Sequence, residues 1–291
     1  MQRGALIAGA VMMAFAGSAS AAVMPQDGGL TLLEPATSVM REITSFHDFL
    51  LPIIAAISAF VLVLLLWVVV RYNRRANPTP RKFTHNMLVE VVWTVVPVLI
   101  LVAIAWRSFP LIYDQERIPE EAELTLKVTG NSWRWDFEYP DLGVMITSNL
   151  LDEATAEAEG RPYLLAVDTP LYVPTDTVVR VLVTSNDVIH AFAVPAFGVK
   201  EDAIQGRVNE TWFNVDRPGI YYGQCSELCG INHAYMPLEV HAVPRAEFEA
   251  WVAANGGSMA TAEAETPAPA PAEAGAAPAA EPSAPAASPT R

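Results

Sequence analysis

The sequence predicts a membrane-anchored all-β protein, in which two membrane-spanning helices precede a β-sandwich or barrel. Two long apolar runs occur in the first third of the chain, and a series of short alternating strands follows them. In addition, 52% of all residues are hydrophobic although the formal net charge is −14, which is unusual for a single soluble domain. The high hydrophobic content and the high negative charge are compatible if the apolar residues lie in a membrane and the acidic residues lie in an exposed domain.

The first 21 residues have the features of a secretory signal peptide. Arg3 precedes the apolar run Ala5–Ala16, and small residues follow in an A-x-A arrangement up to Ala21. A run of about a dozen apolar residues is too short to cross a bilayer, which needs about 20. We therefore expect residues 1–21 to be removed and residues 22–48 to form an N-terminal periplasmic arm.

Residues 49–109 are predicted to form a transmembrane helical hairpin. Phe49–Val70 contains 22 residues without a charge, and Leu88–Trp106 contains 19 residues interrupted only by Glu90. The loop between the two spans contains five positive charges and no acidic residue: Arg71, Arg74, Arg75, Arg81 and Lys82. Positively charged loops remain in the cytoplasm. The sequence therefore predicts a two-pass protein of the bacterial inner membrane, with both termini on the periplasmic side.

Residues 110–256 are predicted to form the exposed β domain. Gly, Pro, Asn and Asp turns separate short alternating segments, a pattern typical of a sandwich or barrel. The predicted strands are Glu123–Thr129, Trp133–Tyr139, Tyr163–Val167, Thr177–Thr184, Ile189–Val194, Arg207–Val215, Gly219–Gln224 and Leu238–Val243. Residues 257–291 are rich in Ala, Pro and Glu and lack aromatic residues, so we expect a disordered tail.

A cluster of soft metal donors lies near the end of this domain. Cys225 and Cys229 are the two cysteines of the chain, and His233 and Met236 follow closely. Thiolates and thioethers favour copper, and two cysteines suit two bridged coppers better than a blue-copper site, which uses one. His190, which follows a strand, is the candidate for a second imidazole ligand. The alternative is a disulfide between the cysteines, since paired cysteines are common outside the cytosol.

The order of these donors resembles that of the binuclear copper centre of cytochrome c oxidase subunit II. The matching positions are His190, Cys225, Glu227, Cys229, His233 and Met236. The resemblance implies a cupredoxin-like Greek-key β-sandwich. It also implies two coppers bridged by the two thiolates, each with one imidazole. Met236 would be the weak axial ligand of one copper, and the backbone carbonyl of Glu227 would bind the other.

The same resemblance implies roles for two further acidic residues. The side chain of Glu227 would bind Mg²⁺ shared with subunit I, although a solvated loop glutamate explains the sequence equally well. Glu90 would lie at the mouth of a proton channel of subunit I. A carboxylate inside a membrane span is costly and therefore suggests a function. Glu90 is only about one turn inside its span, however, so its side chain could also extend to the interface.

Electron entry is implied at Trp133, in the aromatic segment Trp133–Tyr139, although aromatic strand residues are often simply packed in a core. Two positions depart from the family pattern: Arg134 and Phe192 stand where aromatic residues, Trp in the second case, are common. Between Leu111 and Ala253 there are 23 acidic and 9 basic residues, which disfavours nucleic acid and favours a basic partner. The expected docking acids for cytochrome c are Glu138, Asp141, Asp187 and Asp202.

The resemblance therefore implies subunit II of a bacterial cytochrome c oxidase. Such a chain accepts electrons from cytochrome c and passes them to haem in subunit I, where O₂ is reduced to water and protons are pumped. A quinol oxidase subunit would lack the copper ligands. A nitrous oxide reductase would have another large domain and no membrane hairpin. A membrane-anchored copper-delivery protein would leave the two spans and the aromatic segment unexplained.

Overall fold

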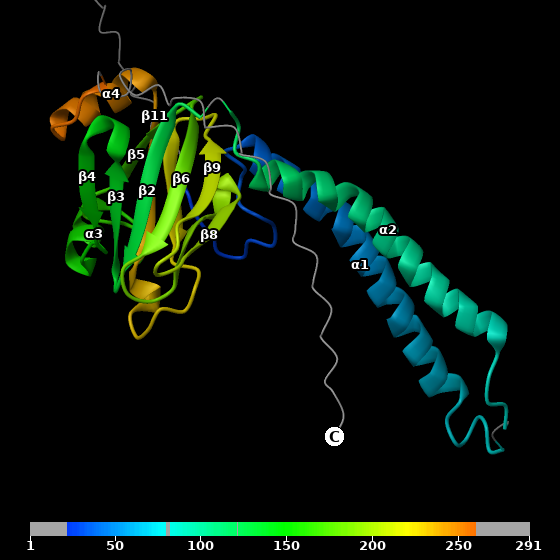
Figure 1. The fold of residues 1–291 in the computed structure, drawn as a ribbon. Helices are drawn as coiled ribbons and strands as arrows, with labels where there is room; N and C mark the ends of the chain where they lie inside the picture. Colours follow the sequence, from blue (N-terminus) through cyan, green and yellow to red (C-terminus); the bar gives the residue numbers. More distant parts are fainter. Residues whose placement is uncertain (1–21, 80–81, 121, 260–291) are drawn as a thin grey trace, which may run out of the picture.

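The computed structural model describes residues 22–79, 82–120 and 122–259. The predicted signal peptide and most of the predicted tail lie outside these ranges. Two long helices, α1 (Ser38–Arg71) and α2 (Met87–Glu116), lie side by side and project from a β domain (Figure 1). Both helices are long and apolar enough to cross a membrane. The predicted order of a helical hairpin followed by a β domain is confirmed.

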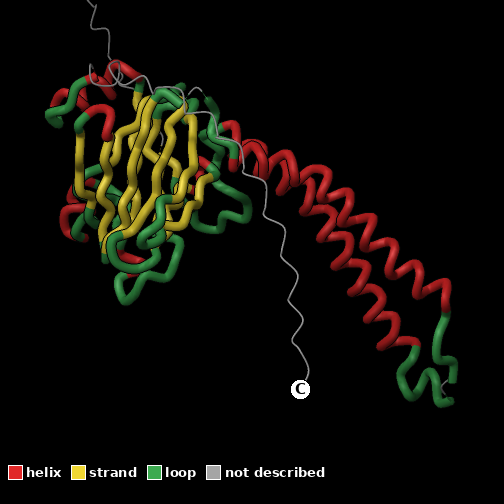
Figure 2. The backbone as a smooth tube through the Cα atoms, in the orientation of Figure 1, coloured by secondary structure: helices red, strands yellow, loops and turns green. Residues whose placement is uncertain are grey.

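The β domain contains two main sheets and a separate hairpin (Figure 2). The first sheet has the order β4 (Val144–Ser148), β3 (Arg134–Tyr139), β2 (Leu124–Asn131), β6 (Val178–Ser185) and β9 (Asn209–Asn214). The second has the order β1 (Ala22–Val23), β10 (Gly219–Gln224), β11 (Pro237–Val243) and β5 (Leu171–Pro174). The hairpin pairs β7 (His190–Val194) with β8 (Val199–Ala203). Helices α3 (Glu153–Glu159) and α4 (Arg245–Ala254) complete the domain.

The core lies between the two main sheets. Side chains alternate along β2, so that Leu126 and Val128 are fully buried while Lys127 faces outward. On the other sheet, Leu171 and Val240 are fully buried and belong to the same apolar cluster. This alternation is expected in a β-sandwich, where each sheet has one face buried in the core and one polar face toward solvent.

The helical hairpin is joined firmly to the β domain at the start of α1. The Thr37 hydroxyl donates to the carbonyl oxygen of Phe197 at 2.8 Å and also accepts the Met40 N–H, which caps the helix. Arg41 forms an ion pair with Asp216 of the β domain. Farther along, the apolar side chains of both helices are largely exposed within this chain. A surface of this kind needs lipid or partner subunits to cover it.

Three differences from the sequence prediction are clear. The helices continue beyond the predicted hairpin of residues 49–109 at both ends, because Thr37 caps α1 early and α2 continues to Glu116. The predicted strand Tyr163–Val167 is wrong: the chain turns there, with Leu165 N–H bonded to the Pro162 carbonyl. Strand β2 pairs in parallel with β6, and β5 pairs in parallel with β11, pairings that a local pattern does not reveal.

Candidate metal centre

The donor cluster occupies the loop between β10 and β11, at the end of the sandwich away from α4 (Figure 1). Pairing of these adjacent antiparallel strands brings the two ends of the loop together. Cys225 N–H donates to the Met236 carbonyl at 3.2 Å, and the indole of Trp135 donates to the same carbonyl at 3.4 Å. The loop therefore closes on itself, and its first and last donor residues become neighbours.

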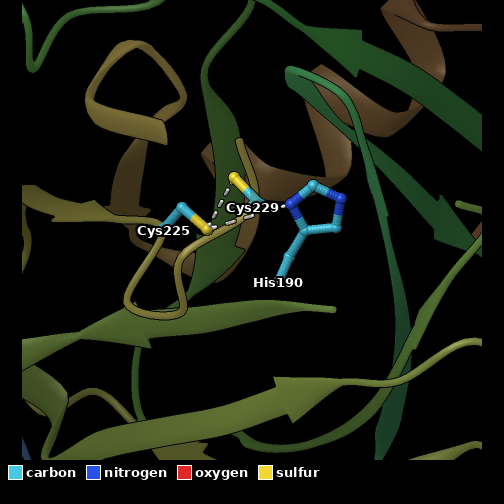
Figure 3. Close-up of side chains that lie close together, drawn as sticks. All are labelled: His190, Cys225 and Cys229. Carbon is cyan, nitrogen blue, oxygen red and sulfur yellow. Dashed lines mark hydrogen bonds between the residues drawn. The ribbon is translucent and has the colours of Figure 1, made fainter. Parts of the chain in front are cut away.

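The donor atoms converge in a compact group. The two cysteine Sγ atoms are 3.8 Å apart, and Cys225 Sγ lies 3.9 Å from His190 Nδ1 (Figure 3). Cys229 Sγ lies 3.6 Å from His233 Nδ1 and 3.5 Å from Met236 Sδ. One imidazole nitrogen therefore lies close to each of the two sulfurs.

Glu227 contributes backbone rather than its side chain to this group. Its carbonyl oxygen lies 3.3 Å from Cys225 Sγ, whereas Met236 Sδ lies 3.5 Å from Cys229 Sγ. The predicted positions of both weak donors are thus close to the sulfurs, with one beside each. The Glu227 carboxylate is half-buried, and the structure gives it no ligand role.

The environment of the cysteines fits a metal better than a disulfide. Both thiols are free, and His190, Cys225, Cys229 and Met236 are almost completely buried. Burial, reinforced by the neighbouring charge of Cys225, raises the pKa of the Cys229 thiol. Two adjacent buried thiolates therefore repel each other unless a cation lies between them. Soft sulfur donors together with imidazoles suit copper.

His190 is held on every side at the start of β7. Its ring is fully buried, its Nδ1 faces Cys225, and its Nε2 lies 2.8 Å from Asp187 Oδ1. A Cβ atom added to Gly130 would lie 2.7 Å from the ring, so only glycine fits at that position of β2. Trp135 packs against the ring edge at a centroid distance of 6.0 Å. Phe192, one of the departures from the family pattern, is buried beside Trp135.

Trp133 lies against the outer side of the cysteine loop. It is half-buried in the turn between β2 and β3, and its indole N–H donates to the Cys229 carbonyl at 3.2 Å. A Cβ atom added to Gly230 would lie 3.1 Å from the indole. The neighbouring Arg134 points to Asp136 at 3.4 Å, so its charge is directed to the sheet face. Trp133 thus connects the protein surface with a cysteine of the cluster.

The four expected docking acids all have partners within the chain. Glu138 pairs with Lys127 at 2.9 Å, and Asp202 pairs with Lys200 at 2.9 Å. Asp141 accepts the Thr125 N–H at 3.2 Å and lies beyond the last residue of β3, at the end opposite Trp133. Asp187 faces His190, and hydrogen bonds from His190, Val188 and Ser132 lower the pKa of its carboxyl although burial alone would raise it. The docking role of these acids stays a prediction.

Glu90 lies in the first turn of α2. Its Oε1 accepts the backbone N–H of Asn86 at 3.2 Å, while the Asn86 side chain accepts the Val89 N–H. This reciprocal arrangement caps the helix, and a negative charge there also complements the positive end of the helix dipole. The structure therefore supplies a local role for Glu90, and its role at a proton channel stays a prediction.

Comparison with known proteins decides the family. The family model described as cytochrome c oxidase subunit II, periplasmic domain, matches residues 124–243, and the corresponding transmembrane-domain model matches residues 25–111. A Rickettsia bellii protein named probable cytochrome c oxidase subunit 2 is 47% identical over 230 residues, covering 79% of this chain and 85% of that protein. The chain belongs to the cytochrome c oxidase subunit II family. Cytochrome c oxidase subunit 2 of Cereibacter sphaeroides is 43% identical over 245 residues, covering 78% and 80% of the two chains.

Among solved structures, the periplasmic domain of subunit II from Bradyrhizobium japonicum is 47% identical, with a TM-score of 0.45. The match covers 48% of this chain and 97% of the Bradyrhizobium japonicum domain. The family assignment makes the protein a two-pass membrane subunit of a haem–copper oxidase, with an electron-transfer role and other oxidase subunits as partners. The family carries a binuclear copper centre, and in this chain the donor atoms of His190, Cys225 and Cys229 all lie within 4.8 Å of one another.

Sequence reasoning missed the residues that support the ligands. In the sequence, Trp135 is one aromatic residue of the segment Trp133–Tyr139, and nothing there indicates that its indole donates to the Met236 carbonyl and closes the loop. Gly130 gave no signal, because a glycine before a turn has many explanations. The sequence position of Asp187 suggests docking, and its place three residues before His190 also allows a local hydrogen bond.

Proposed function

We propose that this subunit II accepts electrons from reduced cytochrome c at a binuclear copper centre and passes them to haem in subunit I. The observation that carries the proposal is the converging set of two thiols, two imidazoles, a thioether and a backbone carbonyl. The proposed ligands are His190, Cys225, Glu227 through its carbonyl, Cys229, His233 and Met236. When bound, two bridged coppers supply reversible one-electron redox chemistry.

The chain contributes rigidity and exclusion of water to this chemistry. The buried donors Cys225, Cys229 and Met236 all lie in one short loop closed by backbone hydrogen bonds, so they move little relative to each other. A preorganised site reduces the reorganisation that accompanies a change in charge. Every donor is supplied by the protein itself, which leaves no position for a substrate and suits electron transfer.

Trp133 is proposed as the point at which electrons enter. The support is its half-exposed indole, which is hydrogen-bonded to the carbonyl of Cys229. Cytochrome c would dock over this turn, and the acidic surface of the domain would attract a basic partner from a distance. Glu138, Asp141, Asp187 and Asp202 remain the proposed docking acids. We infer that the β domain and both termini lie in the periplasm, because the basic loop between the two spans is expected to remain in the cytoplasm.

Contacts with subunit I are proposed at two glutamates. The half-buried Glu227 carboxylate is a candidate ligand for Mg²⁺ at the subunit interface. Glu90, at the cytoplasmic end of α2 in the proposed topology, is a candidate for proton entry into subunit I.

Stopped-flow reduction of the copper-loaded, full-length chain by cytochrome c tests the entry role. Trp133→Ala should slow electron transfer within the complex at least about tenfold and leave binding affinity unchanged, because it removes a contact route rather than a charge. Trp251→Ala is the matched control: it removes a half-buried tryptophan from α4, at the opposite end of the domain. Equal rates for the two variants would show that electrons enter elsewhere.

A further inference from the structure

The carboxylate of Asp187 occupies an unusual position for a docking charge. It lies in the connection between β6 and β7, and its side chain is 37% exposed. Oδ1 lies 2.8 Å from His190 Nε2 and also accepts the Val188 N–H at 2.7 Å. Oδ2 accepts the backbone N–H of Ser132 at 2.7 Å. Both oxygens are therefore occupied by groups of the same chain.

The contact through Oδ1 determines which nitrogen of His190 faces the cysteines. A carboxylate is only an acceptor, so the hydrogen of a neutral imidazole must reside on Nε2. The lone pair is then on Nδ1, which faces Cys225 Sγ at 3.9 Å. Hydrogen bonds of this kind, from a carboxylate to the outer nitrogen, commonly orient metal-binding histidines.

The contact through Oδ2 connects the same carboxylate to the turn that contains Trp133. Ser132 directly precedes Trp133, whose indole is bonded to the Cys229 carbonyl. The neighbouring Asn186 strengthens the connection, because its N–H donates to the Gly130 carbonyl at 3.1 Å and its side chain donates to Asn131 at 2.9 Å. The β6–β7 connection and the β2–β3 turn are thus joined around the histidine.

We propose that Asp187 is a positioning residue that fixes the orientation of His190 and the placement of the Trp133 turn at once. This role comes in addition to the docking role proposed above, and it depends on contacts inside the chain rather than on long-range attraction of cytochrome c. This inference rests on the proposed copper site. It differs from the docking role, which depends on the charge that the carboxylate presents at the surface, where its side chain is 37% exposed.

Three variants of the full-length chain, purified in detergent and loaded with copper, test the proposal. Asp187→Ala removes both acceptors. Asp187→Asn removes the same charge but keeps one amide oxygen as an acceptor. Glu210→Gln is the matched control, because it removes one exposed negative charge on β9 whose partner is Arg180. The readouts are the electron paramagnetic resonance spectrum, the rate of copper loss to a chelator, and the salt dependence of cytochrome c binding.

The alanine variant should change the spectrum and release copper about 10–100-fold faster, since loss of a supporting hydrogen bond typically costs that factor in metal affinity. The asparagine variant should lie between the alanine variant and wild type, and the control should match wild type. If the alanine variant fails to fold, the same measurements on the asparagine variant test the proposal. Wild-type spectra and copper retention in the asparagine and alanine variants, with flattened salt dependence, would overturn the proposal and favour docking. A wild-type chain without a two-copper spectrum would instead contradict the proposed function.

Discussion

The buried carboxylate of Glu239 is predicted to anchor the segment between β4 and β5 to the sheet beneath it. Glu239 lies on β11, and its side chain is 1% exposed. Its Oε2 accepts from Arg161 Nη2 at 2.6 Å and from the Val167 N–H at 3.0 Å, and its Oε1 lies 2.8 Å from His241 Nε2. Replacement of Glu239 by alanine leaves three donors without this acceptor.

The cost of Glu239→Ala follows from this geometry. Removal of one partner from a buried ion pair costs about 3–5 kcal/mol. Arg161 is 25% exposed and keeps a second partner, Glu159, so we expect the lower end, about 3 kcal/mol. For a domain of this size, about 1 kcal/mol shifts Tm by roughly 3–5 °C, so Tm should fall by about 10 °C. Glu239→Gln keeps an acceptor oxygen for Arg161 and should cost about half as much.

The same carboxylate should make stability depend on pH. Burial alone would raise the pKa of Glu239, but hydrogen bonds from His241, Val167 and Arg161 lower it below the ordinary value of 4.5. A lowered folded-state pKa stabilises the protein above the unfolded-state pKa, and this contribution is lost as pH falls through the folded-state value. The difference in Tm between wild type and Glu239→Gln should therefore be constant near neutral pH and shrink below about pH 4.5.

Thermal unfolding of the full-length chain in detergent, followed by near-ultraviolet circular dichroism, measures both effects. Glu249→Ala is the matched control, since it breaks an exposed pair with Arg245 on α4 that is worth at most about 1 kcal/mol. A Tm for Glu239→Ala within about 2 °C of this control would refute the anchoring role. A Tm difference that persists unchanged at pH 3 would refute the electrostatic part alone.

Two further predictions concern Glu90 and the docking acids. Glu90→Gln keeps an oxygen that can accept the Asn86 N–H, so the helix should persist. Slower turnover of the whole oxidase with unchanged copper reduction would support a role of Glu90 in proton entry. Turnover within about twofold of wild type would contradict that role. Asp202→Asn should weaken cytochrome c binding and flatten its salt dependence, measured by titration across a salt series. Asp141→Asn should do so less, because β3 places it about 20 Å from Trp133, beyond the screening length of about 8 Å. Equal effects would contradict docking over Trp133.

The sequence predicted those features whose cause is local or strongly patterned. Apolar runs of 22 and 19 residues, with Glu90 as their one charged residue, have few explanations other than membrane helices, and the confirmed hairpin follows from them. The spacing of Cys225, Cys229, His233 and Met236 placed all four in one loop, so their convergence required only that the loop close. His190 was found because the set lacked an imidazole, although it is 35 residues away from Cys225.

Features that depend on distant contacts were not predictable in this way. Tyr163–Val167 has the composition of a strand, but hydrogen bonds of the turn and of Arg161 to the Val167 carbonyl determine its conformation. A count of acidic residues treats Asp187 and Asp202 alike, although one faces a buried histidine and the other pairs with a lysine at the surface. Net charge describes a domain, and the role of each carboxylate depends on the donors that folding brings to it.

The content and electronic structure of copper in the isolated full-length chain test the central claim most directly. The donor set predicts two coppers per chain after reconstitution, with an electron paramagnetic resonance spectrum in which one unpaired electron couples to both copper nuclei. Cys225→Ser should abolish that spectrum, because it removes one of the two bridging sulfurs. One copper per wild-type chain, or a disulfide between Cys225 and Cys229 in freshly isolated protein, would contradict the account.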